Sequence, residues 1–169
     1  MRLRDDRLVA LRNARSEDIP AVQQFVRDLS DQSRRRRFFA PLRELTADQL
    51  DRVTRTRDPR ELALVAETVD DAQARIVAMA QYVLCEPDDA EFAVVVHDAF
   101  QRQGLGTELI GALAEHAARQ GLTALAAFVL ADNWPMLTLL ASLGCELASD
   151  DHERVIRAVR RLDTEAVPA

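Results

Sequence analysis

The sequence predicts a single mixed α/β domain, and three observations support this. Apolar residues recur at helical spacing after a first strand-like run, as at Val22 and Val26. Three consecutive apolar runs, residues 61–67, 75–85 and 91–96, then indicate an antiparallel meander. A loop with two glycines follows, and helical and strand-like segments alternate to the end of the chain.

The first strand is expected over residues 8–14, with Ser16 as the cap of the helix that follows. The next helical stretch contains four arginines, residues 34–37. We interpret them as a solvated helix face beside two packed phenylalanines, Phe38 and Phe39, with an anion-binding or partner-binding role as the alternative. Each of these segments is short enough to belong to one compact domain.

The remaining elements are read from caps and stop signals. Thr46 is expected to cap a short helix, and Gly121 and Gly144 are expected to end two later ones. The sequence thus predicts a helix over residues 47–54, a helix over 107–120, a buried strand over 122–130, a helix over 131–144 and a last strand or strand pair over 154–162. The expected domain covers residues 1–169, with its core at about 8–162.

Composition limits the class of protein. The chain has 169 residues and a net charge of -6, which argues against a nucleic-acid partner. It contains no apolar run of membrane-spanning length, and its start is too charged for a signal peptide, so we expect a cytoplasmic protein without membrane contact. The two cysteines, Cys85 and Cys145, lack metal-site spacing, and Cys85 is expected to be a buried thiol because it closes an apolar run.

The two glycines of the loop, Gly104 and Gly106, stand one residue apart between a strand and a helix. Backbone N–H groups gather at such a turn and the helix dipole adds partial positive charge, which together suit a phosphate. A plain turn is the alternative for so short a motif. Two known phosphate loops do not fit: the chain has no lysine for a P-loop, and a dinucleotide fingerprint needs glycine at Leu109.

The loop reads QRQGLG and matches the pattern Q/R-x-x-G-x-G/A. This resembles the acetyl-CoA signature of the Gcn5-related N-acetyltransferase (GNAT) family. The element order over residues 11–162 is similar to the family's: strand, two helices, three strands, helix, strand, helix and two strands, with a central splayed strand pair. The stretches "RFFAPLRELT", "ELALVAE", "AEFAVVV" and "LADNWPMLTLLASLG" most resemble the acetyltransferase domain of bacterial Pat-type protein lysine acetyltransferases.

The resemblance implies acetyl-CoA as co-substrate and no metal. The pantetheine arm would lie between the splayed strands against backbone groups, and the pyrophosphate would meet N–H groups of the loop. The coenzyme-binding residues implied in this way are Val94, Val95, Val96, Gln101, Arg102, Gln103, Gly104, Leu105, Gly106, Thr107 and Asn133. A plain buried strand is the alternative for the valines, and a helix cap is the alternative for Asn133.

Glu91 is the candidate general base, because the resemblance places a catalytic glutamate at the head of this strand. An exposed strand-end glutamate is the alternative. Many family members carry a tyrosine general acid where this chain has Leu140, and Tyr82 is its only tyrosine, so the acid stays unassigned. Trp134 is expected to be a packing residue.

The leading hypothesis is an N-acetyltransferase that moves acetyl from acetyl-CoA to a primary amine, with a protein lysine as the expected acceptor. One alternative is an enzyme for a small amine. Another is a non-catalytic sensor that binds acyl-CoA. The sequence leaves the oligomeric state open.

Overall fold

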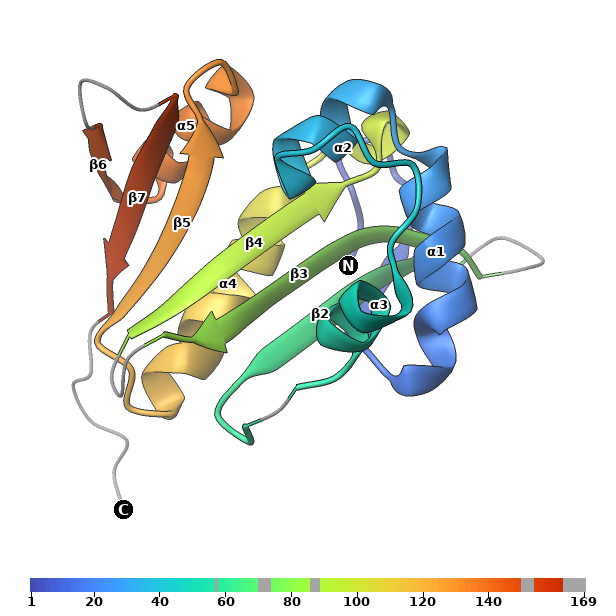
Figure 1. Cartoon of the computed structure of the whole chain (residues 1–169), viewed down its shortest axis with the longest axis horizontal. Coiled ribbons are helices and arrows are strands. Elements are labelled where there is room, and N and C mark those ends of the chain that lie inside the picture. The colour runs from blue at the N-terminus through green and yellow to red at the C-terminus, as the bar shows by residue number, and fades with distance from the viewer. Residues whose placement is uncertain (57, 70–73, 86–88, 150–153, 163–169) are drawn as a thin grey trace.

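A seven-stranded mixed sheet organises the protein (Figure 1). The computed structural model describes residues 1–56, 58–69, 74–85, 89–149 and 154–162. The strands are β1 (Val9–Asn13), β2 (Leu62–Thr68), β3 (Ile76–Leu84), β4 (Asp89–Val96), β5 (Ala124–Leu130), β6 (Glu146–Ser149) and β7 (Val155–Arg161). They lie in the order β1-β2-β3-β4-β5-β7-β6, and every neighbouring pair is antiparallel except the parallel pair β4 and β5.

In the part of the chain that the structure describes, five α-helices and two short 3₁₀ turns connect the strands. They are η1 (Ser16–Asp18), α1 (Ile19–Asp28), α2 (Asp31–Phe38), α3 (Ala47–Thr54), η2 (Asp98–Phe100), α4 (Leu105–Arg119) and α5 (Trp134–Ser142). The expected α/β fold and the meander β2-β3-β4 are confirmed. The first crossover contains three helices, as the helical stretches of the sequence indicate, and not the two of the family's order. Among the described residues no helix has both the length and the apolar character needed to cross a membrane.

Two hydrophobic clusters cover the two faces of the sheet. Figure 1 shows α1 and α3 on the near face and α4 on the far face. Val22 and Val26 of α1 are fully buried in the near cluster, where Val95 of β4 is also buried. Leu109 and Leu113 of α4 are fully buried in the far cluster. Because side chains alternate along a strand, each residue of β4 can be assigned to one face.

Helix caps follow the sequence signals in part. Thr46 accepts the N–H of Gln49 and caps α3, as expected. Ser16 does not cap α1, because it begins the turn η1 and Asp18 occupies the cap position of α1. Gly121, which has φ of +80°, follows the end of α4 as expected.

The arginine-rich helix α2 is not a uniform solvated face. Arg34 is buried, and its guanidinium donates to the carbonyls of Arg27 at 3.0 Å and of Leu29, at the C-terminus of α1. Carbonyls at the C-terminus of a helix lack intrahelical donors, so the Arg34 guanidinium supplies hydrogen-bond donors that α1 itself does not have there. Phe38 packs against the near cluster, whereas Phe39 ends the helix with φ of +57° and is exposed.

Cys85 is placed differently from the expectation. Cys85 is exposed, because β3 ends at Leu84 and the thiol lies just beyond the sheet. Cys145 is buried, and burial raises the pKa of its thiol. The apolar run before Cys85 therefore predicted the strand but not where its buried part ends.

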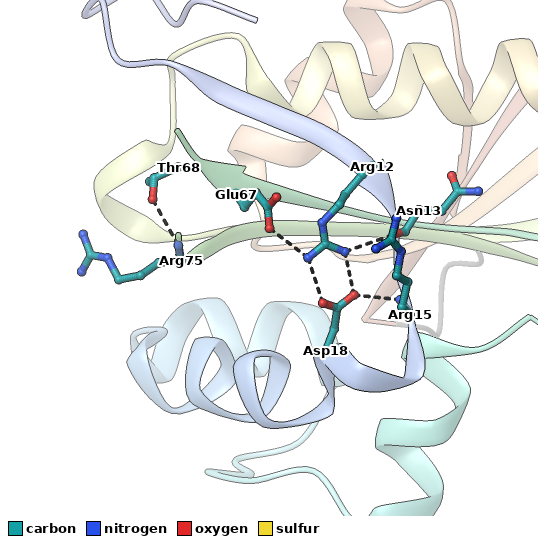
Figure 2. A network of polar contacts seen from close by, with 7 residues as sticks. All are labelled: Arg12, Asn13, Arg15, Asp18, Glu67, Thr68 and Arg75. Carbon is teal, nitrogen blue, oxygen red and sulfur yellow. Dashed lines mark hydrogen bonds and ion pairs between the residues drawn. The ribbon is translucent and has the colours of Figure 1, made fainter. Parts of the chain in front are cut away.

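A guanidinium-centred network joins the first crossover to the sheet (Figure 2). Arg12 of β1 contacts both carboxylate oxygens of Asp18 at 2.8 Å and Glu67 of β2 at 2.8 Å. Asp18 also accepts the backbone N–H of Arg15 at 2.8 Å. The Arg12 hydrogen bonds hold the pKa of the Asp18 carboxyl below its usual value, against the opposing effect of burial. The network fixes where α1 leaves the sheet.

We expect Arg12→Leu to lower the free energy of unfolding by about 2 kcal/mol, since it leaves two partly buried carboxylates without their cation. Because the folded pKa of Asp18 is depressed, its stabilisation is present above the unfolded pKa and is lost as the pH falls through the folded pKa. The variant should therefore lose less stability than the wild type on acidification. Urea unfolding at several pH values measures both effects.

Arg52→Gln is the matched control, because it removes only an exposed pair with Asp48 on α3. It should change stability by less than about 0.5 kcal/mol. Equal losses in the two variants would contradict the assigned role of Arg12.

Candidate active site

The pairing between β4 and β5 stops partway along the strands. Three residue pairs join them, and the last is Glu91 with Ala126. Both strands continue, β4 to Val96 and β5 to Leu130, so a gap opens between them beyond Glu91. Figure 1 shows β4 and β5 diverging along their length. We call this gap the wedge.

The backbone of β4 faces the wedge at alternate residues. In an antiparallel ladder, hydrogen-bonded and non-bonded pairs alternate. The N–H of His97 donates to a β3 carbonyl at 2.8 Å, so the N–H and C=O of Val95 also point to β3. Those of Val94 and Val96 point into the wedge, and the Gln101 amide that reaches the Val96 carbonyl at 3.0 Å agrees with this. Val95, expected from the sequence to share the role, directs its backbone groups elsewhere.

The glycine loop and the start of α4 form a cradle, residues 101–107. The first N–H that donates back along α4 is that of Glu108, to the Gly104 carbonyl at 3.2 Å. The N–H groups before it, of Leu105, Gly106 and Thr107, are in the first turn, where no helical acceptor exists. Several donors and the positive end of the helix dipole thus converge on one spot.

Backbone conformation, helix packing and burial explain different residues of the cradle. Gly104 has φ of +91°, a conformation that side chains disfavour. At Gly106 a Cβ would approach Leu139 of α5 to 3.2 Å, so this glycine serves helix packing. The side chain of Leu105 is buried in the far cluster, and among the described residues neither Leu105 nor Gln103 lines the pocket described below.

Helix α2 is held beside the cradle by Asp98, which sequence reasoning had not singled out. Asp98 accepts the backbone N–H of Ser30 at 2.9 Å, its hydroxyl at 2.6 Å and the hydroxyl of Ser33 at 2.8 Å. Burial alone would raise the pKa of Asp98, but these hydrogen bonds lower it. The Gln101 amide also donates to the hydroxyl of Ser33 at 3.2 Å. The loop after β4 therefore both begins the cradle and holds α2 by hydrogen bonds.

A pocket of about 830 Å³ passes through the wedge from the cradle to the near face. It brings together most of the residues singled out by sequence. They are Glu91, Val94, Val95, Val96, Gln101, Arg102, Gly104, Gly106, Thr107 and Asn133. We call it the transfer pocket. Its volume suits a small organic ligand.

Glu91 lies where the wedge closes. Ala90 and Phe92 belong to the far cluster, so the alternation of β4 directs Glu91 to the near face. Glu91 is the only acidic residue among the described residues that line the transfer pocket. Arg37 of α2 interacts electrostatically with Glu91. Burial lowers the pKa of the Arg37 guanidinium to about 10, and the negative charge of Glu91 opposes this shift. Arg37 stays charged at neutral pH.

Arg36 and Arg35 extend from α2 across the wedge. Arg35 pairs with Asp132 at 2.9 Å, and Arg36 lines the transfer pocket with a buried Nε for which the described residues offer no acceptor. Asn133, which follows Asp132 in the chain, occupies the N-cap position of α5 but makes no side-chain capping hydrogen bond. Trp134 is 71% exposed, so the expected packing role is wrong.

Tyr82, the only tyrosine of the sequence, does not line the transfer pocket. Tyr82 is fully buried, donates to the Arg60 carbonyl and contacts Nδ1 of His116 on α4 at 2.6 Å. Burial raises its pKa to about 12. Leu140, the position at which many relatives carry a tyrosine, is fully buried. Among the described residues no cluster of histidine, cysteine or carboxylate side chains could hold a metal ion.

Comparisons with known proteins agree with this geometry. Residues 22–144 match the Acetyltransferase (GNAT) family. A curated acetyltransferase of Pseudomonas aeruginosa is 31% identical over 157 residues, which cover 91% of this chain and 84% of the relative.

Solved structures match over nearly the whole chain. The GNAT domain of S. lividans PAT is 26% identical with a TM-score of 0.85, covering 96% of this chain and 95% of that one. The protein yncA of Salmonella typhimurium, solved with its cofactor acetyl-CoA, is 20% identical with a TM-score of 0.71 and shares the fold, covering 95% of this chain and 98% of that one. With the family match spanning most of its length, this chain belongs to the GNAT family of acetyltransferases.

Proposed function

We propose that the protein transfers acetyl from acetyl-CoA to the side-chain amine of a lysine in a protein acceptor. The observation that carries this proposal is the end of β4–β5 pairing at Glu91. It opens the sheet so that one pocket connects a phosphate-type cradle with a carboxylate on the opposite face. A coenzyme can enter from one side and an acceptor from the other.

The chain's own groups fit the coenzyme. The N–H groups of Leu105, Gly106 and Thr107 suit the pyrophosphate, and the wedge-facing backbone of Val94 and Val96 suits the amides of pantetheine. These groups belong to the backbone, so they do not depend on the identity of the side chains. Acetyl-CoA in the yncA structure supports the same assignment by analogy of fold.

Glu91 removes the proton that blocks attack. At pH 7 the neutral form of a lysine amine lies about 4.6 kcal/mol above the ammonium, from a pKa near 10.4 and 1.36 kcal/mol per unit. A carboxylate at the closed end of the wedge accepts that proton, directly or through water. Arg37 assists, because a second positive charge in the pocket favours the neutral amine.

Acetyl transfer follows once the amine is neutral. The amine nitrogen bonds to the thioester carbonyl carbon and then releases its extra proton to water. The carbon–sulfur bond breaks, and the thiolate leaves with the electron pair. The wedge-facing N–H of Val94 is placed to stabilise the negative charge on the carbonyl oxygen. With Tyr82 sequestered and Leu140 buried, the thiolate takes its proton from water.

The protein acceptor is supported by the likeness to the GNAT domain of S. lividans PAT. Incubation with acetyl-CoA and either a lysate of denatured proteins or a panel of small amines, read by mass spectrometry, tests it. Acetylated protein lysines support the proposal. Turnover of small amines alone contradicts the protein acceptor, and coenzyme binding without turnover on either panel favours a sensor.

Gly104→Ala should weaken coenzyme A binding more than tenfold, because the new side chain disfavours the φ of +91° that holds the cradle. Gly111→Ala is the matched control: it lies within α4, and its added Cβ would meet no atom within 4 Å. The control should bind normally and gain stability, as alanine does over glycine in a helix. Calorimetric titration with coenzyme A decides; equal affinities in the two variants would refute the cradle.

Glu91→Gln should leave the affinity for acetyl-CoA unchanged and lower turnover by about a hundredfold or more, the loss expected for a general base. Raising the pH should partly restore the rate, because more of the acceptor amine is then neutral. Glu146→Gln, an exposed glutamate on β6, is the control and should change turnover less than about twofold. Superimposable pH profiles for the wild type and Glu91→Gln would move the base elsewhere.

A further inference from the structure

A short hairpin precedes β1. Arg2 bridges to Leu8, the N–H of Leu3 donates to the Arg7 carbonyl at 2.9 Å, and Asp6 turns the chain with φ of +70°. Leu3 is only 3% exposed and belongs to the far cluster, on the face that carries α4. The hairpin is therefore a fixed part of that face.

Arg7 connects the hairpin to the segment that leads into the cradle. Its guanidinium carbon lies 3.7 Å from the centre of the Phe100 ring, and it donates to the Ala99 carbonyl at 2.6 Å. Both partners belong to η2, and residue 101 begins the cradle. Phe100 itself is buried and lines the transfer pocket. These contacts place the tip of the hairpin beside the phosphate site.

The arginines of the hairpin differ in their partners. Arg2 pairs with Asp6 at 3.2 Å, and Arg7 pairs with Asp5 at 2.6 Å. Arg4 is exposed and has no ion pair among the described residues. Of the three hairpin arginines, Arg4 is the one that lines the transfer pocket, as Arg102 of the cradle also does. A free guanidinium at the edge of an anion site is a strong, geometrically selective donor to phosphate.

The chemistry of coenzyme A specifies what such a donor could bind. The coenzyme carries two phosphates in its pyrophosphate and a third on the ribose 3′ oxygen. The first-turn N–H groups of α4 account for the pyrophosphate, and the 3′-phosphate needs a further donor beside the cradle. We propose that Arg4 binds the 3′-phosphate of coenzyme A, so that the hairpin is a second element of the coenzyme site. This inference rests on the proposed binding of the coenzyme at the cradle.

Calorimetric titration with coenzyme A and with 3′-dephospho-coenzyme A tests the proposal. The wild type should bind coenzyme A about tenfold more tightly than the dephospho form, which is about 1.4 kcal/mol. Arg4→Gln should lose this preference while keeping the wild-type affinity for the dephospho form. Arg2→Gln, whose parent side chain is paired and outside the transfer pocket, should keep the preference. Arg4→Lys, which keeps the charge, should retain part of it.

The outcomes separate the inference from the proposed function. Equal wild-type affinity for the two ligands, or an Arg4→Gln variant that weakens both by the same factor, overturns the 3′-phosphate assignment and leaves the cradle intact. A wild type that binds neither ligand overturns the coenzyme site itself. Melting temperatures of the variants identify any loss that comes from unfolding of the hairpin, and a preference that Arg4→Gln retains at unchanged melting temperature also overturns the assignment.

Discussion

The interrupted ladder between β4 and β5 is the constraint on which the rest of the site depends. Buried backbone N–H and C=O groups require partners, and a sheet supplies them strand by strand. Beyond Glu91, β4 faces a strand that has turned away, so Val94 and Val96 keep their polar groups directed at a gap. A ligand with amide groups spaced along an extended arm satisfies the same requirement. The proposed binding surface thus arises because the fold withholds a hydrogen-bonding partner from β4.

Segments far apart in the chain maintain that gap. Asp98 holds the start of α2, Arg34 of the same helix closes the end of α1, and Arg35 reaches Asp132 beyond β5. The Arg12 network fixes the other end of α1 against β1 and β2. Helix α2 is therefore anchored to elements on both sides of the wedge. The same framework holds Arg37 in the transfer pocket, where it interacts electrostatically with Glu91.

Local signals in the sequence predicted the parts of the fold that local physics controls. The helical spacing of Val22 and Val26, the cap at Thr46 and the stop at Gly121 depend on near neighbours in the chain, and the structure has them as expected. The resemblance to a family supplied the order of the strands and the choice of Glu91. Among the residues singled out, the pocket gathers Glu91 with most of the cradle.

What the sequence could not predict depends on contacts across the fold. Arg34 is buried because the end of α1 happens to lie beside it, and no property of an arginine run indicates that. Cys85 and Trp134 are exposed because their elements end or begin at the rim. Val95 differs from its neighbours only through the register with β3, which requires the paired strand to be known. The place of Arg4 depends on a hairpin that packs against η2, almost a hundred residues away in the chain.

The narrow connection across the sheet has a thermodynamic consequence. β1 to β4 form one block and β5 to β7 another, and among the described residues the ladder joins the two blocks through three residue pairs. A molecule that lies in the wedge as an additional strand would bridge the blocks, and anything that binds the folded state alone raises its stability with ligand concentration. The resistance of the folded chain to heat and proteolysis would then follow the supply of coenzyme, so that the protein persists longest where its acyl donor is abundant.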